Sequence, residues 1–406
     1  MNAQGLSPSG APSGAARHTL VIATLSFSAF LTAMTTRITD GMVTVIGDEF
    51  ALDWTTATAA ISAFAIVHGI AQLLMGPLGE VFGKLRMITT GCAGAAAASL
   101  VCALAPSFDG LLSGRALAGI ATAPLIPLAM AWIGDVVPYA QRQPVLARFI
   151  LGQILGLSTG IWLGGLVADH FAWRQPFWFI ALGYLLATVV LGLQQRRLAA
   201  ARAAEHGPEA RPGWRQVPIG LKRTLASSWA RKVLLTAYLE GALLFGVLAF
   251  VGIYLSQRHG IGLATASATV MPFGLGGIVY VLVSRRLLGR LGEYRLVLLG
   301  GALMASAMLA LAFSAQWQWA LPACFCCGLG FYMMHNTLQT KATQMNPEHR
   351  SAAMSVYASC FFFGQASGVA AMGWAAQALG MAPTMVLAAV LMVGLALAFG
   401  RGCRRH

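Results

Sequence analysis

The sequence predicts an all-α integral membrane protein in which twelve transmembrane helices form two pseudo-symmetric six-helix bundles. Its composition carries most of this prediction, because 57% of the 406 residues are hydrophobic and only 10% are charged. Soluble domains carry about 25% charged residues, and disordered chains combine high charge with low hydrophobicity. A weak internal repeat in the sequence predicts that the helices divide into two similar halves.

Twelve apolar runs follow a short N-terminal segment. A helix needs about 20 apolar residues to cross a bilayer, and each run is near this length. The first run could be a signal peptide, but eleven more runs follow it, which favours an uncleaved first helix. The expected spans are 19–46, 56–77, 87–106, 110–133, 145–168, 175–194, 231–255, 264–285, 295–314, 317–339, 351–374 and 382–400.

The segments between the runs set the expected domain organisation. Residues 1–17 are rich in Gly, Pro, Ser and Ala and predict a disordered cytoplasmic tail. An N-terminal six-helix bundle is expected at 18–194 and a C-terminal one at 231–400, joined by a basic cytoplasmic linker at 195–230. Residues 401–406 form a second cytoplasmic tail. The linker could also contact anionic lipid.

The charges predict the orientation in the membrane. The net charge is +14, but the basic residues are scattered between apolar runs, so no nucleic-acid partner is expected. With the N-terminus inside, the inner loops and tails hold 23 Lys and Arg residues, whereas the outer loops hold Arg174 and Arg258. This asymmetry predicts a multi-pass protein with both termini in the cytoplasm. Its size and short loops favour a bacterial inner (plasma) membrane.

An internal repeat supports the two bundles. The segment from Gly83 to Arg86 is echoed 209 residues later from Gly292 to Arg295. The segment from Pro138 to Arg142 is echoed from Pro347 to Arg350, and in both cases a Gly-x-x-x-Gly begins 14 residues beyond the arginine. Two matches at nearly one offset indicate duplication of a six-helix unit. Secondary transporters are built from such repeats, with a site between them at the bilayer midplane.

The segment Gly76–Arg86 resembles the Gly-x-Leu-x-Asp-Arg-x-Gly-Arg signature of the major facilitator superfamily, and the likeness extends over residues 19–400. Glu80 replaces the usual aspartate. The resemblance implies a network of charges, joined by Asp135 after the fourth helix, that latches the outward-facing state. A positive-inside loop without a gating role is the alternative. The implied gating residues are Gly76, Gly79, Glu80, Gly83, Lys84, Arg86 and Asp135.

The fifth span resembles the superfamily's antiporter signature Gly-x-x-x-Gly-Pro-x-x-Gly-Gly. Ile161 replaces the proline, but every glycine is present, and glycines at this spacing let helices approach closely. The resemblance thus implies the 12-helix drug:proton antiporter group. The span also reads Gly-x-Ser-x-Gly, but no strand precedes it, so an enzyme is not expected. A non-transporting receptor is a further alternative. The four glycines are Gly156, Gly160, Gly164 and Gly165.

Asp40 and Glu240 are the acids that fall within apolar runs. Glu240 lies eight residues past Lys232, about 12 Å along a helix. Because apolar surroundings favour the protonated form of a carboxyl, Glu240 is the main candidate for proton coupling, with a hydrogen-bonded structural acid as the alternative. Asp40 is a second candidate, although it could pair with Arg37 three residues earlier. Arg115 begins a segment resembling the superfamily's Arg-x-x-x-Gly signature, which implies proton transfer; snorkelling or a structural pair is the alternative.

A substrate cavity needs a few polar groups among apolar walls. His335, Asn336 and Gln339 form the best cluster, although each polar side chain could instead bond a neighbouring helix. The candidate cavity residues are Arg37, Gln153, Trp162, Tyr238, Tyr332, His335, Asn336 and Gln339.

These features predict a secondary active transporter of small molecules that works by alternating access. Proton-coupled efflux of lipophilic or amphipathic compounds is favoured, and the missing P-loop indicates an ion gradient as the energy source. Proton-coupled uptake of a small metabolite, including an anionic one, is the alternative. The expected partners are the substrate, protons and the lipid bilayer. The resemblance implies a monomer, and we expect no cofactor, no disulfide framework and no metal site.

Overall fold

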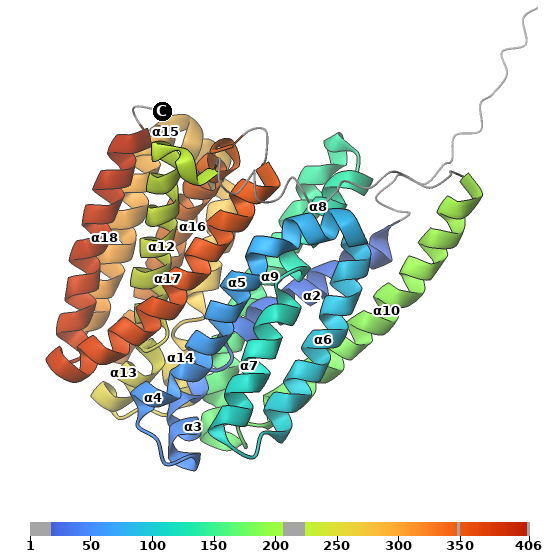
Figure 1. Cartoon of the computed structure of the whole chain (residues 1–406). Coiled ribbons are helices and arrows are strands. Elements are labelled where there is room, and N and C mark those ends of the chain that lie inside the picture. Colours follow the sequence, from blue (N-terminus) through green and yellow to red (C-terminus); the bar gives the residue numbers. More distant parts are fainter. Residues whose placement is uncertain (1–17, 206–223, 347–349, 404–406) are drawn as a thin grey trace, which may run out of the picture.

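The computed structural model describes residues 18–205, 224–346 and 350–403, and within these ranges it contains helices and no strand (Figure 1). The predicted all-α class is confirmed. The N-terminal half contains α2 (Thr19–Arg37), η1 (Asp40–Met42), α3 (Val43–Glu49), α4 (Trp54–Ala57), α5 (Ala59–Phe82), α6 (Lys84–Leu104), α7 (Phe108–Thr122), α8 (Leu125–Val136), α9 (Tyr139–His170) and α10 (Gln175–Glu205). The C-terminal half contains α12 (Ser228–Leu248), α13 (Val251–His259), α14 (Leu263–Ala268), α15 (Pro272–Phe313), η3 (Trp317–Trp319), α16 (Ala320–Gln344), α17 (Arg350–Leu379) and α18 (Met381–Cys403).

The helices have the length and composition of membrane-spanning segments. Nine segments of the described residues are long and apolar enough to cross a bilayer. One of them, Leu263–Phe313, contains two consecutive long helices because Gly292 interrupts α15 with non-helical torsions. The multi-pass architecture is confirmed, and the count of twelve stays a prediction. The predicted tail at 1–17 lies outside the described residues, as does the part of the linker at 206–223.

Close packing through glycines repeats in the two halves. In the N-terminal half, α9 crosses α2 so closely that a Cβ on Gly156 would overlap the carbonyl of Phe30. In the C-terminal half, α17 crosses α12, and a Cβ on Gly364 would overlap the carbonyl of Tyr238. Gly156 and Gly364 stand 208 residues apart, and so do Phe30 and Tyr238. The repeat in the sequence therefore corresponds to the same helix crossing in each half.

Two tight turns also correspond. Gly83, between α5 and α6, has φ of 92°, and Gly292, within α15, has φ of 69°. These torsions lie in the left-handed region that favours glycine because a Cβ would clash there. The repeated glycines at positions 83 and 292 thus form the same kind of turn in both halves.

The two halves meet mainly along the helix pairs α5 with α17 and α9 with α14, and α9 also contacts α15. We call the end with α3, α4 and α13 the lower end and the opposite end, near Cys403, the upper end (Figure 1). At the lower end, Gln377 donates a hydrogen bond to Thr55 Oγ1 at 2.5 Å, and the backbone N–H of Ala264 donates to Asp169 Oδ2 at 2.6 Å. These bonds close the lower end.

Ion pairs at the upper end stay within one half. Lys84 Nζ lies 2.5 Å from Asp135 Oδ2 in the N-terminal half, and Lys341 Nζ lies 2.8 Å from Glu293 Oε2 in the C-terminal half. Lys84 and Glu293 each follow the glycine turn of their half and stand 209 residues apart. The base of the first pair therefore corresponds to the acid of the second. Neither of these two ion pairs joins one half to the other.

The tight crossing of α12 and α17 makes a testable prediction. Gly364→Ala should destabilise the protein by about 1–3 kcal/mol, because the added methyl group has no space against Tyr238. Gly394→Ala on α18 is the matched control, since a Cβ there meets nothing within 4 Å. Thermal unfolding of the two purified variants checks this, and equal melting temperatures would contradict the close packing.

Candidate functional site

Glu240 of α12 and His335 of α16 form a pair inside the C-terminal half. Glu240 is fully buried, and its Oε2 lies 2.7 Å from His335 Nδ1. The other carboxyl oxygen, Oε1, has no hydrogen-bond partner among the described residues. The His335 side chain is 16% exposed, against 0% for Glu240. The imidazole is therefore the more accessible group of the pair.

Aromatic side chains hold the His335 ring in place. The Tyr357 hydroxyl lies 3.3 Å from Nδ1, and the rings of Phe331 and Phe361 each lie 4.7 Å from the imidazole, centroid to centroid. The expected cluster of His335 with Asn336 and Gln339 is not supported by the described contacts. His335 turns to Glu240, whereas Asn336 is exposed.

A second buried group, on α2 and η1, reaches across to the other half. Arg37 Nη1 donates to Asp40 Oδ2 at 3.2 Å, which is the ion pair that their spacing allows. Arg37 Nη2 donates to Gln365 Oε1 on α17 of the C-terminal half. The guanidinium carbon also lies 3.9 Å from the centroid of the Phe245 ring on α12. Arg37 and Asp40 are each only 2% exposed.

Arg115 is buried completely on α7 and bonds within the N-terminal half. Its Nε donates to the Ala60 carbonyl at 3.1 Å, and its Nη1 donates to the Thr35 carbonyl at 2.8 Å. The guanidinium also lies over the Phe64 ring at 4.5 Å. The snorkelling alternative is therefore wrong, because the head group is 0% exposed. The described contacts tie α7 to α2 and α5.

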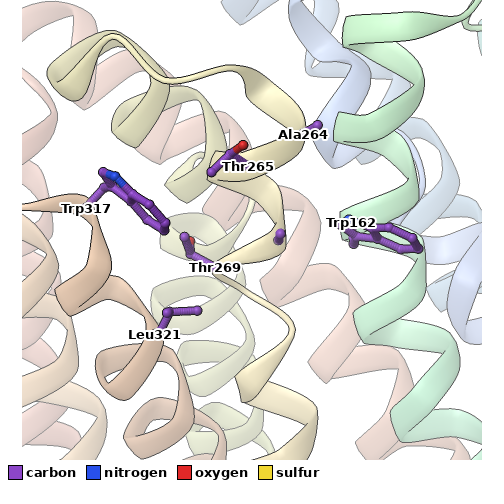
Figure 2. Close-up of a pocket in the computed structure, with 7 residues that line it drawn as sticks. Trp162, Ala264, Thr265, Thr269, Trp317 and Leu321 are labelled. Atoms are coloured by element: carbon purple, nitrogen blue, oxygen red, sulfur yellow. The ribbon is translucent and has the colours of Figure 1, made fainter.

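The other candidate cavity residues are spread over the molecule. Trp162 lines a pocket of about 370 Å³ with residues of α14, η3 and α16 (Figure 2), and none of the other candidates lines it. The Tyr238 hydroxyl accepts a hydrogen bond from Ser367 at 2.7 Å. Tyr332 packs on Phe331, and Gln153 is half-buried on α9. Of the eight candidates, Trp162 is thus the one that lines this pocket, and a common cavity for the others stays a prediction.

Of the charged residues in the predicted gating network, Lys84 and Asp135 form an ion pair in the part of the chain that the structure describes. Gly76 and Gly79 lie on the last turns of α5, and Gly83 lies in the turn that follows. Glu80 and Arg86 are exposed, and neither has an ion-pair partner among the residues that the structure describes.

The four antiporter-like glycines lie on one continuous helix, α9. Gly156, Gly160 and Gly164 face the backbone of α2 and the residues that follow it. Gly165 instead faces Ser267 of α14, so that a Cβ there would overlap the serine side chain. The four glycines therefore let α9 pack closely against α2 of its own half and against α14 of the other half.

The family model of the Major Facilitator Superfamily matches residues 25–368. The chain belongs to the major facilitator superfamily. Its members are membrane-embedded transporters of small molecules and not enzymes, so the predicted family and the predicted absence of an enzymatic role are both confirmed.

Known transporters are similar over different lengths. The chain is 24% identical to the uncharacterized MFS-type transporter YwfA of Bacillus subtilis, over 87% of this chain and 84% of that protein. It is 28% identical to the multidrug export protein EmrB of Escherichia coli, over 44% of this chain and 35% of that protein. A crystal structure of a POT family transporter with 5-aminolevulinic acid matches with a TM-score of 0.74 at 13% identity, over 93% of this chain and 95% of that one. This last likeness shows the major facilitator fold.

Gln365 is the site residue that sequence reasoning missed. It bonds Arg37 across the two halves of this superfamily member, but a single glutamine in an apolar run carries no strong signal. Its position directly after Gly364, within the repeated Gly-x-x-x-Gly, places it at a close crossing of helices. That position is the signal that could have found it.

The closed lower end can be tested by a disulfide. A Cβ on Gly373 of α17 would lie 3.9 Å from the Cβ of Thr55 of α4, close to the separation of about 3.8 Å in disulfides. Thr55→Cys with Gly373→Cys should therefore crosslink the two halves spontaneously. After cleavage at a protease site inserted in the linker, the fragments should stay joined until reduction. Each single variant is a control, and fragments that separate without reductant would contradict this arrangement.

Proposed function

We propose that this superfamily member exports small lipophilic or amphipathic compounds in exchange for protons. The observation that carries the proposal is the fully buried Glu240 carboxyl at 2.7 Å from His335. Ionisable residues inside a membrane are costly and mark functional sites by default. The similarity to EmrB, whose name describes a multidrug export protein, supports the export of drug-like compounds.

His335 would pass protons to and from Glu240. The imidazole is the accessible member of the pair, and a ring nitrogen already contacts the carboxyl. A proton arriving through His335 would neutralise the Glu240 carboxylate and remove the attraction between an imidazolium and a carboxylate. Tyr357, at 3.3 Å from the ring, would hold the imidazole in the orientation that this transfer needs.

Alternating access would use the contacts at the lower end as the outer gate. With both termini in the cytoplasm of a plasma-membrane protein, as the charges predict, the lower end is the outer side. Opening it breaks the bonds of Gln377 to Thr55 and of Ala264 to Asp169. The Lys84–Asp135 turn would then close against the C-terminal half on the cytoplasmic side. The monomer would suffice, because both halves belong to one chain.

The proton role of Glu240 makes a direct prediction. In energised everted membrane vesicles, a transported compound should partly collapse the pH gradient reported by a dye. Glu240→Gln should abolish this collapse while compound binding to the purified protein stays within about twofold. The amide keeps the shape of the side chain but cannot take up or release a proton. Asp48→Asn, at an exposed carboxylate, is the control and should behave as wild type. Full proton exchange by Glu240→Gln would rule out this role.

Proton-coupled uptake of an anionic metabolite is the second candidate. It is favoured by Arg115, whose Nη2 has no hydrogen-bond partner among the described residues. Counterflow of labelled compounds in proteoliposomes separates the two functions. Export of lipophilic compounds predicts exchange of several unrelated lipophilic compounds and none of small carboxylates. Saturable exchange restricted to an anionic metabolite would favour uptake instead.

A further inference from the structure

The pocket beside α14 is built from both halves of the chain. Trp162 of α9 lines it from the N-terminal half. The C-terminal half contributes Thr265 of α14, Thr269 directly after this helix and Trp317 of η3 (Figure 2). We call this feature the lateral pocket. A compound that fills its volume of about 370 Å³ would contact both halves at once.

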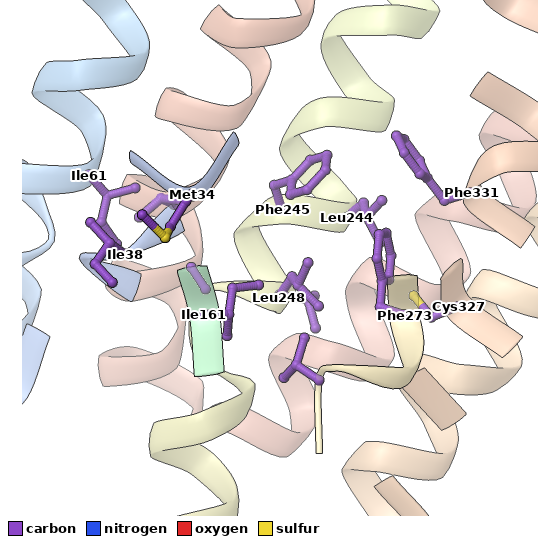
Figure 3. Packing of buried hydrophobic residues seen from close by; sticks show 14 of the residues in the cluster. Met34, Ile38, Ile61, Ile161, Leu244, Phe245, Leu248, Phe273, Cys327 and Phe331 are labelled. Atoms are coloured by element: carbon purple, nitrogen blue, oxygen red, sulfur yellow. The ribbon is translucent and has the colours of Figure 1, made fainter. Parts of the chain in front are cut away.

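The lateral pocket faces the lipid. Leu155 is 46% exposed and lies seven residues before Trp162, on the same face of α9. On the side of the C-terminal half, Leu321 of the pocket lining is 38% exposed. Exposed apolar side chains of membrane-spanning helices face the lipid chains. Ile161, turned by about 100° around α9 from Trp162, instead lies among the buried residues where the halves meet (Figure 3).

The lining suits a small neutral aromatic compound. None of the lining residues that the structure describes is charged, so an ion would lose its hydration there without gaining a partner. The indoles of Trp162 and Trp317 offer rings on which an aromatic compound can pack. The exposed Thr265 hydroxyl can bond one polar group, which favours such a compound over a lipid chain. The volume is near the lower end of the range for ligand sites, about 300–1,000 Å³.

The aromatic lining is not part of the repeated scaffold. The two bonds at the lower end are equivalent, because Asp169 of α9 and Gln377 of α17 stand 208 residues apart. At the same separation, Trp162 corresponds to Ala370. The fold therefore does not require a tryptophan at this position of a helix that joins the halves, and the indole is free to serve a site.

Opening of the lower end would take the lateral pocket apart. Asp169 lies seven residues after Trp162, on the same face of α9, and it accepts a hydrogen bond from the backbone N–H of Ala264, which itself lines the pocket. Between these positions, Gly165 packs on Ser267 of α14. A movement that breaks this seam also carries Trp162 away from α14. The pocket is therefore complete only while the lower end is closed.

We propose that the lateral pocket is an inhibitory site for small neutral aromatic compounds dissolved in the bilayer. A compound that binds the closed lower end alone stabilises this state by its binding free energy. Because transport needs both states, an occupied pocket slows the cycle. The compound enters from the lipid, does not compete with the transported compound and is not itself carried. This effect on the cycle rests on the proposed alternating access, whereas the site itself does not.

Binding to the purified full-length protein in phosphatidylcholine nanodiscs tests the site. Tritiated 4-phenylphenol, a neutral two-ring compound with one hydroxyl, should bind saturably beyond the amount that enters empty nanodiscs. Trp162→Ala should weaken this binding about 3- to 10-fold, the range of a lost aromatic contact. Trp374→Ala is the matched control, because Trp374 of α17 is 72% exposed and lies outside the pocket. The charged analogue 4-phenylbenzoate should not displace the label.

Trp317→Ala should weaken binding in the same range and serves alone if Trp162→Ala does not fold. Absence of saturable binding, which is the result expected if a lipid chain fills the pocket, would overturn the proposal. An equal loss of affinity in Trp374→Ala would also overturn it.

The crosslinked Thr55→Cys, Gly373→Cys protein tests the coupling to the lower end. It should bind 4-phenylphenol at least as tightly as the same protein after reduction, because its lower end cannot open. Weaker binding by the crosslinked form would contradict the proposal.

Inhibition is measured in everted vesicles. 4-Phenylphenol should lower the maximal rate of proton exchange driven by a transported compound, and Trp317→Ala should reduce this inhibition. A raised half-saturating concentration at an unchanged maximal rate would identify a competing substrate and refute the inhibitory site. If no compound drives proton exchange while the binding results hold, the export function fails and the site stands.

Discussion

The structure depends on one constraint, which is that a polar group inside a bilayer must find its partner within the protein. No water is present there to solvate a charge, so each buried ion needs a neighbouring group. Arg115 meets this need through two carbonyls, and Glu240 meets it through His335. Arg37 meets it partly through the opposite half. The choice of partner therefore decides whether a buried charge stabilises one half or links the two.

Duplication supplies the scaffold, and divergence at equivalent positions supplies the chemistry. The glycine crossings of α9 with α2 and of α17 with α12 are the same in both halves. In contrast, Glu240 corresponds to Thr32, which donates a hydrogen bond to a carbonyl of its own helix. Arg37 likewise corresponds to Phe245. Glu240, the candidate for proton coupling, therefore has no equivalent carboxyl in the N-terminal half. At the interface between the halves, the Arg37 guanidinium contacts the Phe245 ring.

The bonds of Gln377 to Thr55 and of Ala264 to Asp169 join the halves at the lower end, whereas the Lys84–Asp135 and Lys341–Glu293 pairs at the upper end stay within their halves. Close approach of α9 to α14 at Gly165 and of α5 to α17 at Gly69 removes space for larger side chains along these seams. Such seams are bistable, because packed helices either interlock or separate. The hydrogen bonds of Thr55 and Asp169 are the contacts that the proposed opening of the lower end would break.

The sequence by itself determined the all-α membrane class, the repeat and the superfamily, because apolar run length, glycine spacing and signature residues are local properties of the chain. It also identified Glu240, Arg37 and Asp40 as unusual, since charges in apolar runs are rare. Only the tertiary structure decided that His335 turns to Glu240, that Trp162 lies beside α14 and η3 and that Gln365 meets Arg37. These contacts join helices far apart in the chain, and their rotation about the helix axes is set by packing rather than by local sequence.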